Sequence, residues 1–145
     1  MNFELLPHTA DIKIRAYGKT KEELFRNALI GMFQSIHPVA PTCKKQGDRL
    51  VCSELSAKHT VELSAPDEES LLVDFLSHAL YLSDVYNEAY LDATITELSK
   101  HHIQATVYGV PITGFEVVEI KAVTYHELEF QQHNDTWHVD IVFDI

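Results

Sequence analysis

Residues 11–36 read DIKIRAYGKTKEELFRNALIGMFQSI and combine the two patterns that decide the fold. Apolar and polar residues alternate over the first seven positions, which is typical of a strand with one buried face. Thr20 and Glu23 then form a T-x-x-E capping box, and apolar residues recur at helical spacing as far as Ile36. A strand followed at once by an amphipathic helix predicts a domain in which helices cover a sheet.

The rest of the chain adds one more helix and several strands. Pro66-Asp67 predicts a helix start with Asp67 as the cap, and this helix is expected to end near Ser83. The later strands follow one another without helices, so they should be mostly antiparallel. We therefore predict an α+β two-layer sandwich, a mostly antiparallel sheet with two amphipathic helices, formed by residues 1–145 as a single domain. Strands are expected near 49–52, 59–65, 91–95, 103–107, 115–124 and 137–145, and a loop at 38–48.

Composition and charge narrow the possible partners. The 145 residues include 22 acidic and 11 basic side chains, which gives a formal net charge of −11. Such a chain repels nucleic acid and anionic membranes at long range, so direct nucleic-acid binding is not expected, whereas a metal ion or a basic protein is attracted. There is no N-terminal apolar segment and no stretch able to span a bilayer, so we expect a cytoplasmic protein without a membrane partner.

Several short motifs are incomplete. Gly18-Lys19-Thr20 lacks the earlier glycine of a phosphate-binding loop, and His126-Glu127 lacks the second histidine of a zinc-protease helix. Cys43 and Cys52 could form one bridge at most, and we expect free thiols in a reducing compartment. Neither a nucleotide-hydrolysing enzyme nor a zinc enzyme is predicted.

The two ends of the chain carry the more informative residues. Asp11 opens the first clear strand, and Asp144 and Ile145 close the last one. If these strands lie side by side, the two side chains and the Ile145 α-carboxylate converge, and such a cluster either takes up protons or binds a cation. Oxygen ligands of this kind select Ca²⁺, Mg²⁺ or Mn²⁺. In the alternative, Asp11 caps a turn, Asp144 is solvated and the two never meet.

Lys121 is the second candidate, in a segment that is otherwise mostly apolar. Its composition favours a side chain that simply faces solvent. In the functional interpretation, the ammonium group lies near a phosphate or an acidic group of a partner.

Four segments carry a more specific signal, and together they resemble the archease family. They occur in the family's order and cover most of the chain. The resemblance implies a two-layer α+β fold and a role as accessory factor of the RtcB-type RNA ligase, which joins RNA ends in tRNA splicing and RNA repair. Archeases are understood to promote guanylylation and multiple turnover of that ligase without ligating RNA themselves. The segments are HTADIKIRAYGKTKEELFRNAL (8–29), EESLLVDFLSHALYL (68–82), IKAVTYHELEF (120–130) and VDIVFDI (139–145).

The resemblance also implies roles for particular residues. Asp11, Asp144 and the terminal Ile145 match the family's metal ligands, for which Ca²⁺ is the usual ion. Lys121 matches a functionally important lysine, and His8 of the HTAD segment is expected to face the partner. No catalytic residue is implied, because the family acts as a protein cofactor.

Two positions depart from the family pattern. Pro7 stands where an acidic residue is common, and Gly109-Val110 stands where many members have Gly-Glu. If those acids help to hold the metal or contact the ligase, metal affinity or partner choice differs in this chain.

Two other functions are weighed against the accessory role. A metal-dependent phosphohydrolase could use the same carboxylates, but the sequence shows no His–carboxylate constellation to act as its general base. A general protein-binding or chaperone-like module would depend on apolar surface and not on Asp11 or Lys121.

Overall fold

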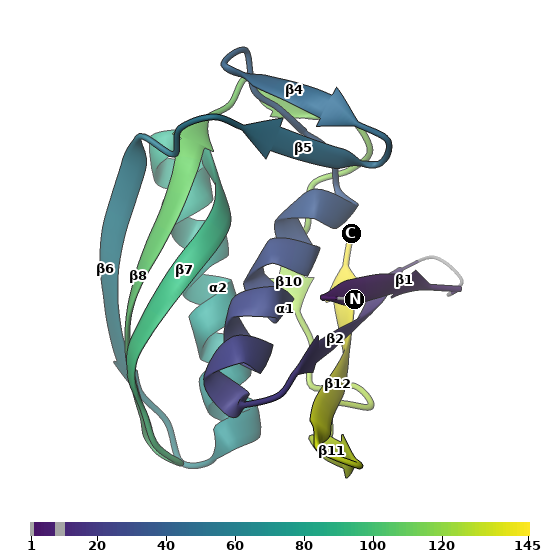
Figure 1. Cartoon of the computed structure of the whole chain (residues 1–145), viewed down its shortest axis with the longest axis vertical. Helices are drawn as coiled ribbons and strands as arrows, with labels where there is room; N and C mark the ends of the chain where they lie inside the picture. Colours follow the sequence, from purple (N-terminus) through teal and green to yellow (C-terminus); the bar gives the residue numbers. More distant parts are fainter. Residues whose placement is uncertain (1, 8–10) are drawn as a thin grey trace.

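The strands of this protein pair in antiparallel fashion throughout the part of the chain that the computed structural model describes, residues 2–7 and 11–145. One larger sheet has the order β1-β2-β12-β10, with β11 also paired to β12, and a second has the order β6-β8-β7 (Figure 1). The α+β prediction is confirmed. The elements are β1 (Phe3–Leu6), β2 (Ile12–Gly18), α1 (Lys21–Ser35), β3 (Pro38–Val39), β4 (Cys43–Gln46), β5 (Arg49–Cys52), β6 (Ala57–Ser64), α2 (Glu68–Tyr86), β7 (Glu88–Leu98), β8 (His102–Pro111), β9 (Gly114–Phe115), β10 (Ala122–Val123), β11 (Gln131–His133) and β12 (Thr136–Asp144).

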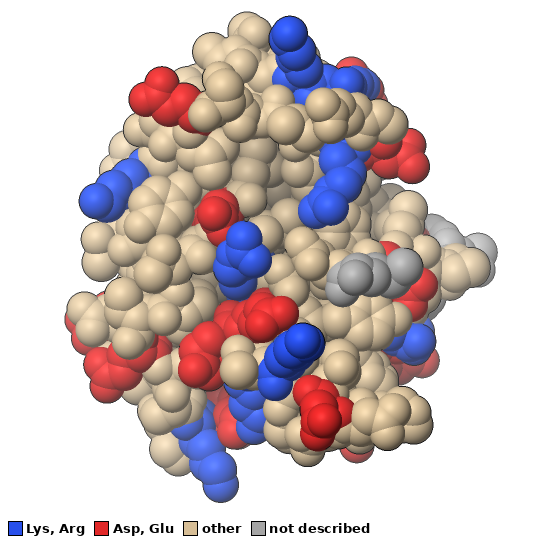
Figure 2. All heavy atoms as spheres, viewed as in Figure 1, with Lys and Arg blue, Asp and Glu red and all other residues tan. Residues whose placement is uncertain are grey.

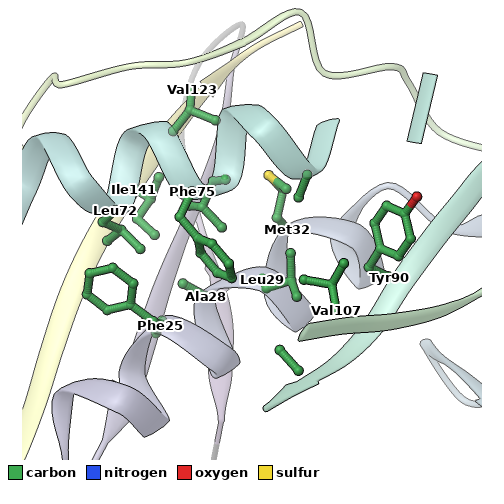
Figure 3. Close-up of a cluster of buried hydrophobic side chains, with 14 of the residues drawn as sticks. Phe25, Ala28, Leu29, Met32, Leu72, Phe75, Tyr90, Val107, Val123 and Ile141 are labelled. Atoms are coloured by element: carbon green, nitrogen blue, oxygen red, sulfur yellow. The ribbon is translucent and has the colours of Figure 1, made fainter. Parts of the chain in front are cut away.

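The core forms where the two helices meet the two larger sheets. Helix α1 packs against both β2 and β7, and α2 packs against β6, β7, β8 and β10. Figure 3 shows Phe25 and Met32 of α1 gathered with Phe75 of α2 and Ile141 of β12. All four side chains are at most 1% exposed. Each buried side chain of this size contributes about 1.5–3 kcal/mol, so this cluster holds β12 and its sheet against both helices.

Both helices begin at the predicted caps. The Thr20 hydroxyl accepts a hydrogen bond from the Glu23 amide at 3.1 Å, and the Asp67 carboxylate accepts one from the Ser70 amide at 2.7 Å. These bonds satisfy main-chain donors that the first helical turn leaves unpaired. Helix α2 runs to Tyr86, three residues beyond the predicted end, and stops where Asn87 adopts a left-handed conformation.

The structure corrects the prediction for residues 38–48. Strand β3 and the hairpin strand β4 occupy this segment, and β4 pairs with β5 around Gly47, whose φ is +61°. The hairpin register places Cys43 opposite Cys52 with their Cα atoms 4.4 Å apart, and the two form a disulfide. The prediction of free thiols is therefore wrong, and the cysteines give no support for a reducing compartment.

The predicted strand at 115–124 is also wrong. Only the two-residue strands β9 and β10 form near it, and the segment between them is irregular. Val117 is 53% exposed, so the Val- and Ile-rich composition does not mark a buried strand here. Lys121 consequently lies just before β10 and not inside a long strand.

Neither helix of the described residues is long and apolar enough to cross a membrane.

Candidate functional site

The first clear strand and the last strand lie side by side (Figure 1). Strand β12 pairs with β2 from Trp137 opposite Gly18 as far as Phe143 opposite Ile12. The next residue on each side of this last pair is Asp144 and Asp11. The register thus brings both aspartates to the same end of two neighbouring strands, with Asp144 at the end of β12 and Asp11 in the bend that precedes β2. This was the condition on which the predicted cluster depended.

Lys121 reaches the same end of the sheet through its main chain. Its amide donates a hydrogen bond to the Asp144 carbonyl oxygen at 2.7 Å, and the following residue, Ala122, pairs with Asp144. Two residues on, Thr124 donates from both its amide and its hydroxyl to the Val142 carbonyl, each at 3.0 Å. The Lys121 side chain is exposed. It is therefore accessible to a partner, and an exposed position also agrees with the solvent-facing interpretation.

A charged network continues along the outer face of β2 and β12. Arg15 donates two hydrogen bonds to Asp140, at 2.6 and 2.9 Å, and Lys13 lies 2.8 Å from Glu127 and 3.9 Å from Asp140. The hydrogen bond with Arg15 lowers the pKa of the Asp140 carboxyl, and the same bond raises the pKa of the Arg15 guanidinium. Sequence reasoning missed Asp140 and Glu127, because only the strand register places Asp140 opposite Arg15.

The donor set at the chain end suits a hard cation. Asp144 is exposed, Ile145 is 36% exposed, and all three predicted ligands offer carboxylate oxygens. Within residues 2–7 and 11–145, no three His, Cys, Asp or Glu side chains gather as metal ligands do. The predicted set does not need three such side chains, because its third ligand is the main-chain carboxylate of Ile145. His8 lies outside the described residues.

Two hydrogen-bonded His–carboxylate pairs of the second sheet appear that the sequence did not indicate, and the more exposed of them joins His102 Nε2 to Glu62 Oε2 at 2.9 Å. The His59 Nε2 lies 2.6 Å from Glu88 Oε1, and the Tyr90 hydroxyl donates to the same oxygen at 2.9 Å. Burial is the main cause that raises the pKa of Tyr90. These residues belong to β6, β7 and β8 of the second sheet, whereas the candidate ligands follow β2 and β12, so neither pair supplies the missing base to the chain-end carboxylates.

Comparisons with known proteins agree on one family. The sequence model of the archease protein family (MTH1598/TM1083) matches residues 3–145. A protein archease of Methanosarcina barkeri is 41% identical over 151 residues, which cover 99% of this chain and 95% of that protein. A protein archease of Pyrococcus furiosus is 31% identical over 150 residues, with 99% and 98% covered.

Solved structures agree with these sequence matches. The solution structure of Methanobacterium thermoautotrophicum protein 1598 has a TM-score of 0.74 and 28% identity, with 99% of each chain covered. The crystal structure of an archease from Thermotoga maritima, described as a possible chaperone, has a TM-score of 0.63 with 97% and 94% covered. The Thermotoga maritima protein is only 23% identical to this chain, so this comparison supports the fold alone.

Proposed function

Because the chain belongs to the archease family, we propose that it is a non-enzymatic activator of an RtcB-type RNA ligase, promoting the ligase's guanylylation and multiple turnover in tRNA splicing and RNA repair. The net charge of −11 supports a basic, RNA-binding enzyme as the partner and disfavours direct contact with RNA. The observation that supports the proposal is the β2–β12 register, which ends at Ile12 opposite Phe143 and so leaves Asp11 and Asp144 next to the same end of the pair.

The proposed activating group is a divalent cation, with Ca²⁺ preferred and Mg²⁺ or Mn²⁺ as alternatives. Asp11, Asp144 and the carboxylate of Ile145 would hold it, since hard cations take oxygen ligands. Ca²⁺ takes about six to eight oxygens, so water or the ligase completes the set. A bound cation would offset negative charge on a phosphate group.

The neighbouring residues have roles that follow from their places. The exposed ammonium group of Lys121 would pair with a phosphate or with an acidic group of the ligase, while its main chain holds the Asp144 carbonyl in place. His8, which precedes Asp11 in the HTAD segment, is proposed to face the partner.

A ligase turnover assay with and without this protein tests the proposal. Asp144→Ala should abolish both calcium binding, measured by calorimetry, and the stimulation of multiple turnover. Asp135→Ala is the matched control, because Asp135 is an exposed aspartate in the turn between β11 and β12. Undiminished turnover with Asp144→Ala contradicts the proposal. Phosphatase or nuclease turnover by the isolated protein also contradicts it and favours the metal-dependent hydrolase.

The third ligand can be tested separately by amidating the carboxylate of Ile145. This change removes one negative charge and leaves every side chain in place. Calcium binding and ligase stimulation should be lost while the unfolding midpoint stays unchanged. An amidated protein that still binds calcium as tightly would exclude the Ile145 carboxylate as a ligand.

A further inference from the structure

A groove of about 410 Å³ lies between α1, β7 and the β4–β5 hairpin. Arg26 and Ile30 of α1 line it on one side and Arg49 of β5 on another, with Leu91 and Asp92 of β7 at its edge. None of the residues of the proposed metal site lines this groove. Arg49 also lines a second groove of about 460 Å³.

The hairpin that forms one wall is locally basic. Residues 43–52 contain Lys44, Lys45 and Arg49 but only one acidic residue, Asp48, in a chain with twice as many acidic as basic side chains. Figure 2 shows basic side chains gathered over this hairpin, at the top of the view. Lys45 is paired with Glu116, so Lys44 and Arg49 supply the positive charge that opposes the charge of the whole molecule and favours a small anion at this point.

The two arginines keep donors available to a ligand. Among the described residues, Arg49 makes no ion pair, and its guanidinium rests over the Phe3 ring with the carbon 5.1 Å from the ring centre. Arg26 uses its Nε for the 2.6 Å bond to Asp92, which leaves its two terminal nitrogens. The same Asp92 oxygen also accepts from the Ala93 amide at 2.8 Å, so its negative charge is partly offset within the protein.

The hairpin wall is held in place before any ligand arrives. The Gln34 side chain of α1 donates to the Leu50 carbonyl at 3.0 Å and accepts from the Leu50 amide at 2.9 Å. The Cys43–Cys52 disulfide closes the hairpin next to this clamp. A preformed wall lowers the ordering cost of binding.

We propose that this groove binds a nucleoside monophosphate. Guanidinium groups match the geometry of phosphate oxygens, which accounts for Arg26 and Arg49. A planar base would lie against the apolar side chain of Leu91, beside the largely buried Ile30. The side-chain amides of Asn2 and Gln46 line the same groove and can bond the sugar or the base edge. Both the volume and the mixture of charged, amide and apolar groups fit such a ligand.

Calorimetric titration of the whole protein with AMP tests the proposal, with adenosine, pyrophosphate and citrate as comparison ligands. One AMP should bind per chain, and adenosine should bind at least tenfold more weakly because it offers no phosphate to the arginines. Arg49→Ala and Arg26→Ala should each weaken AMP binding about tenfold, the loss expected for one charged hydrogen bond. Lys44→Ala is the matched control, because Lys44 is exposed on the same hairpin outside the groove. The affinity of the Lys44→Ala variant for AMP should differ less than twofold from that of the wild type.

Three results would overturn the proposal. The first is an absence of binding at millimolar AMP. The second is citrate binding as tightly as AMP, which indicates a general attraction of anions to the hairpin. The third is that Arg49→Ala and Lys44→Ala weaken AMP binding equally, which also indicates a general attraction of anions to the hairpin. Circular dichroism of each variant shows whether a loss of affinity reflects the groove, because both arginines are accessible and their removal leaves the core unchanged.

Discussion

Arg15 of β2 donates two hydrogen bonds to the Asp140 carboxylate of β12, from Nε to Oδ1 at 2.6 Å and from Nη2 to Oδ2 at 2.9 Å. The two residues are directly opposite in the strand register, and Lys13 adds a second positive charge 3.9 Å from Oδ2. This pair ties together β2, which follows Asp11, and β12, which ends at Asp144. It therefore stabilises the strand alignment on which the proposed metal site depends.

We expect Asp140→Asn to lower the free energy of unfolding by about 1–2 kcal/mol at neutral pH, between the values for exposed and buried ion pairs. The Asp140 pKa is held below its ordinary value of 3.8 in the folded protein. The carboxylate therefore contributes fully above that value, and its contribution disappears as pH falls through the lower folded pKa. The gap between wild type and variant should be constant from neutral pH to about 5 and close below about 3.8.

Urea unfolding at a series of pH values measures this gap. Asp135→Asn is the control, because Asp135 is exposed in a turn and should show no comparable gap at any pH. A gap for Asp140→Asn that persisted unchanged at pH values well below the ordinary pKa would show that the ion pair is not its cause.

Thr20→Ala should destabilise the protein by about 1 kcal/mol through loss of the α1 cap. The Thr20 hydroxyl accepts the Glu23 amide, and alanine leaves that donor to water. Thr20→Ser keeps the hydroxyl and should cost far less. Chemical unfolding of the two variants compares them directly, and equal losses would mean that the methyl group and not the hydrogen bond matters.

Gly109→Ala should be among the most damaging single-atom additions. An added Cβ would overlap the carbonyl oxygen of Ala89 on the neighbouring strand β7, and backbone cannot move aside as a flexible side chain does. We expect a loss of about 3 kcal/mol, the upper end for overpacking. Gly47→Ala is the contrast, because an added Cβ there meets nothing and only the φ of +61° is strained. In thermal unfolding, the midpoint temperature of Gly109→Ala should lie well below that of Gly47→Ala. The reverse order would contradict the steric explanation.

Much of this fold could be predicted from local pattern. The capping box at Thr20, the cap at Asp67 and the alternation that ends in Phe143 each depend on neighbouring residues, and the structure places a helix start or a strand at each. Strand β5 was predicted at 49–52, but its partner β4 was missed because it is largely exposed and shows no alternation of burial, so pairing and not composition defines it. The predicted strand at 115–124 was wrong for the opposite reason. The segment is apolar, but apolar composition without alternation does not define a strand.

The candidate site shows the same division. Asp11, Asp144 and Lys121 could be named because of their sequence context, yet their position near one end of the sheet depends on long-range pairing that a single sequence does not reveal. Asp140 lacked any such context. Its importance comes only from Arg15 lying across from it on a strand 125 residues away.

The Cys43–Cys52 disulfide gives a prediction about stability rather than activity. It links residues nine apart in sequence, and closing a loop of this length in the unfolded chain stabilises the folded state by about 2–3 kcal/mol. The double variant Cys43→Ser/Cys52→Ser should lose this amount in urea unfolding, and a reducing agent should cause the same loss in the wild type. The double variant must not respond to the reductant.

Because Gln34 still holds Leu50 at both main-chain atoms, the reduced hairpin should keep its place, and circular dichroism should be unchanged before unfolding begins. A wild type whose unfolding midpoint ignored the reductant would show that the bridge does not stabilise the protein.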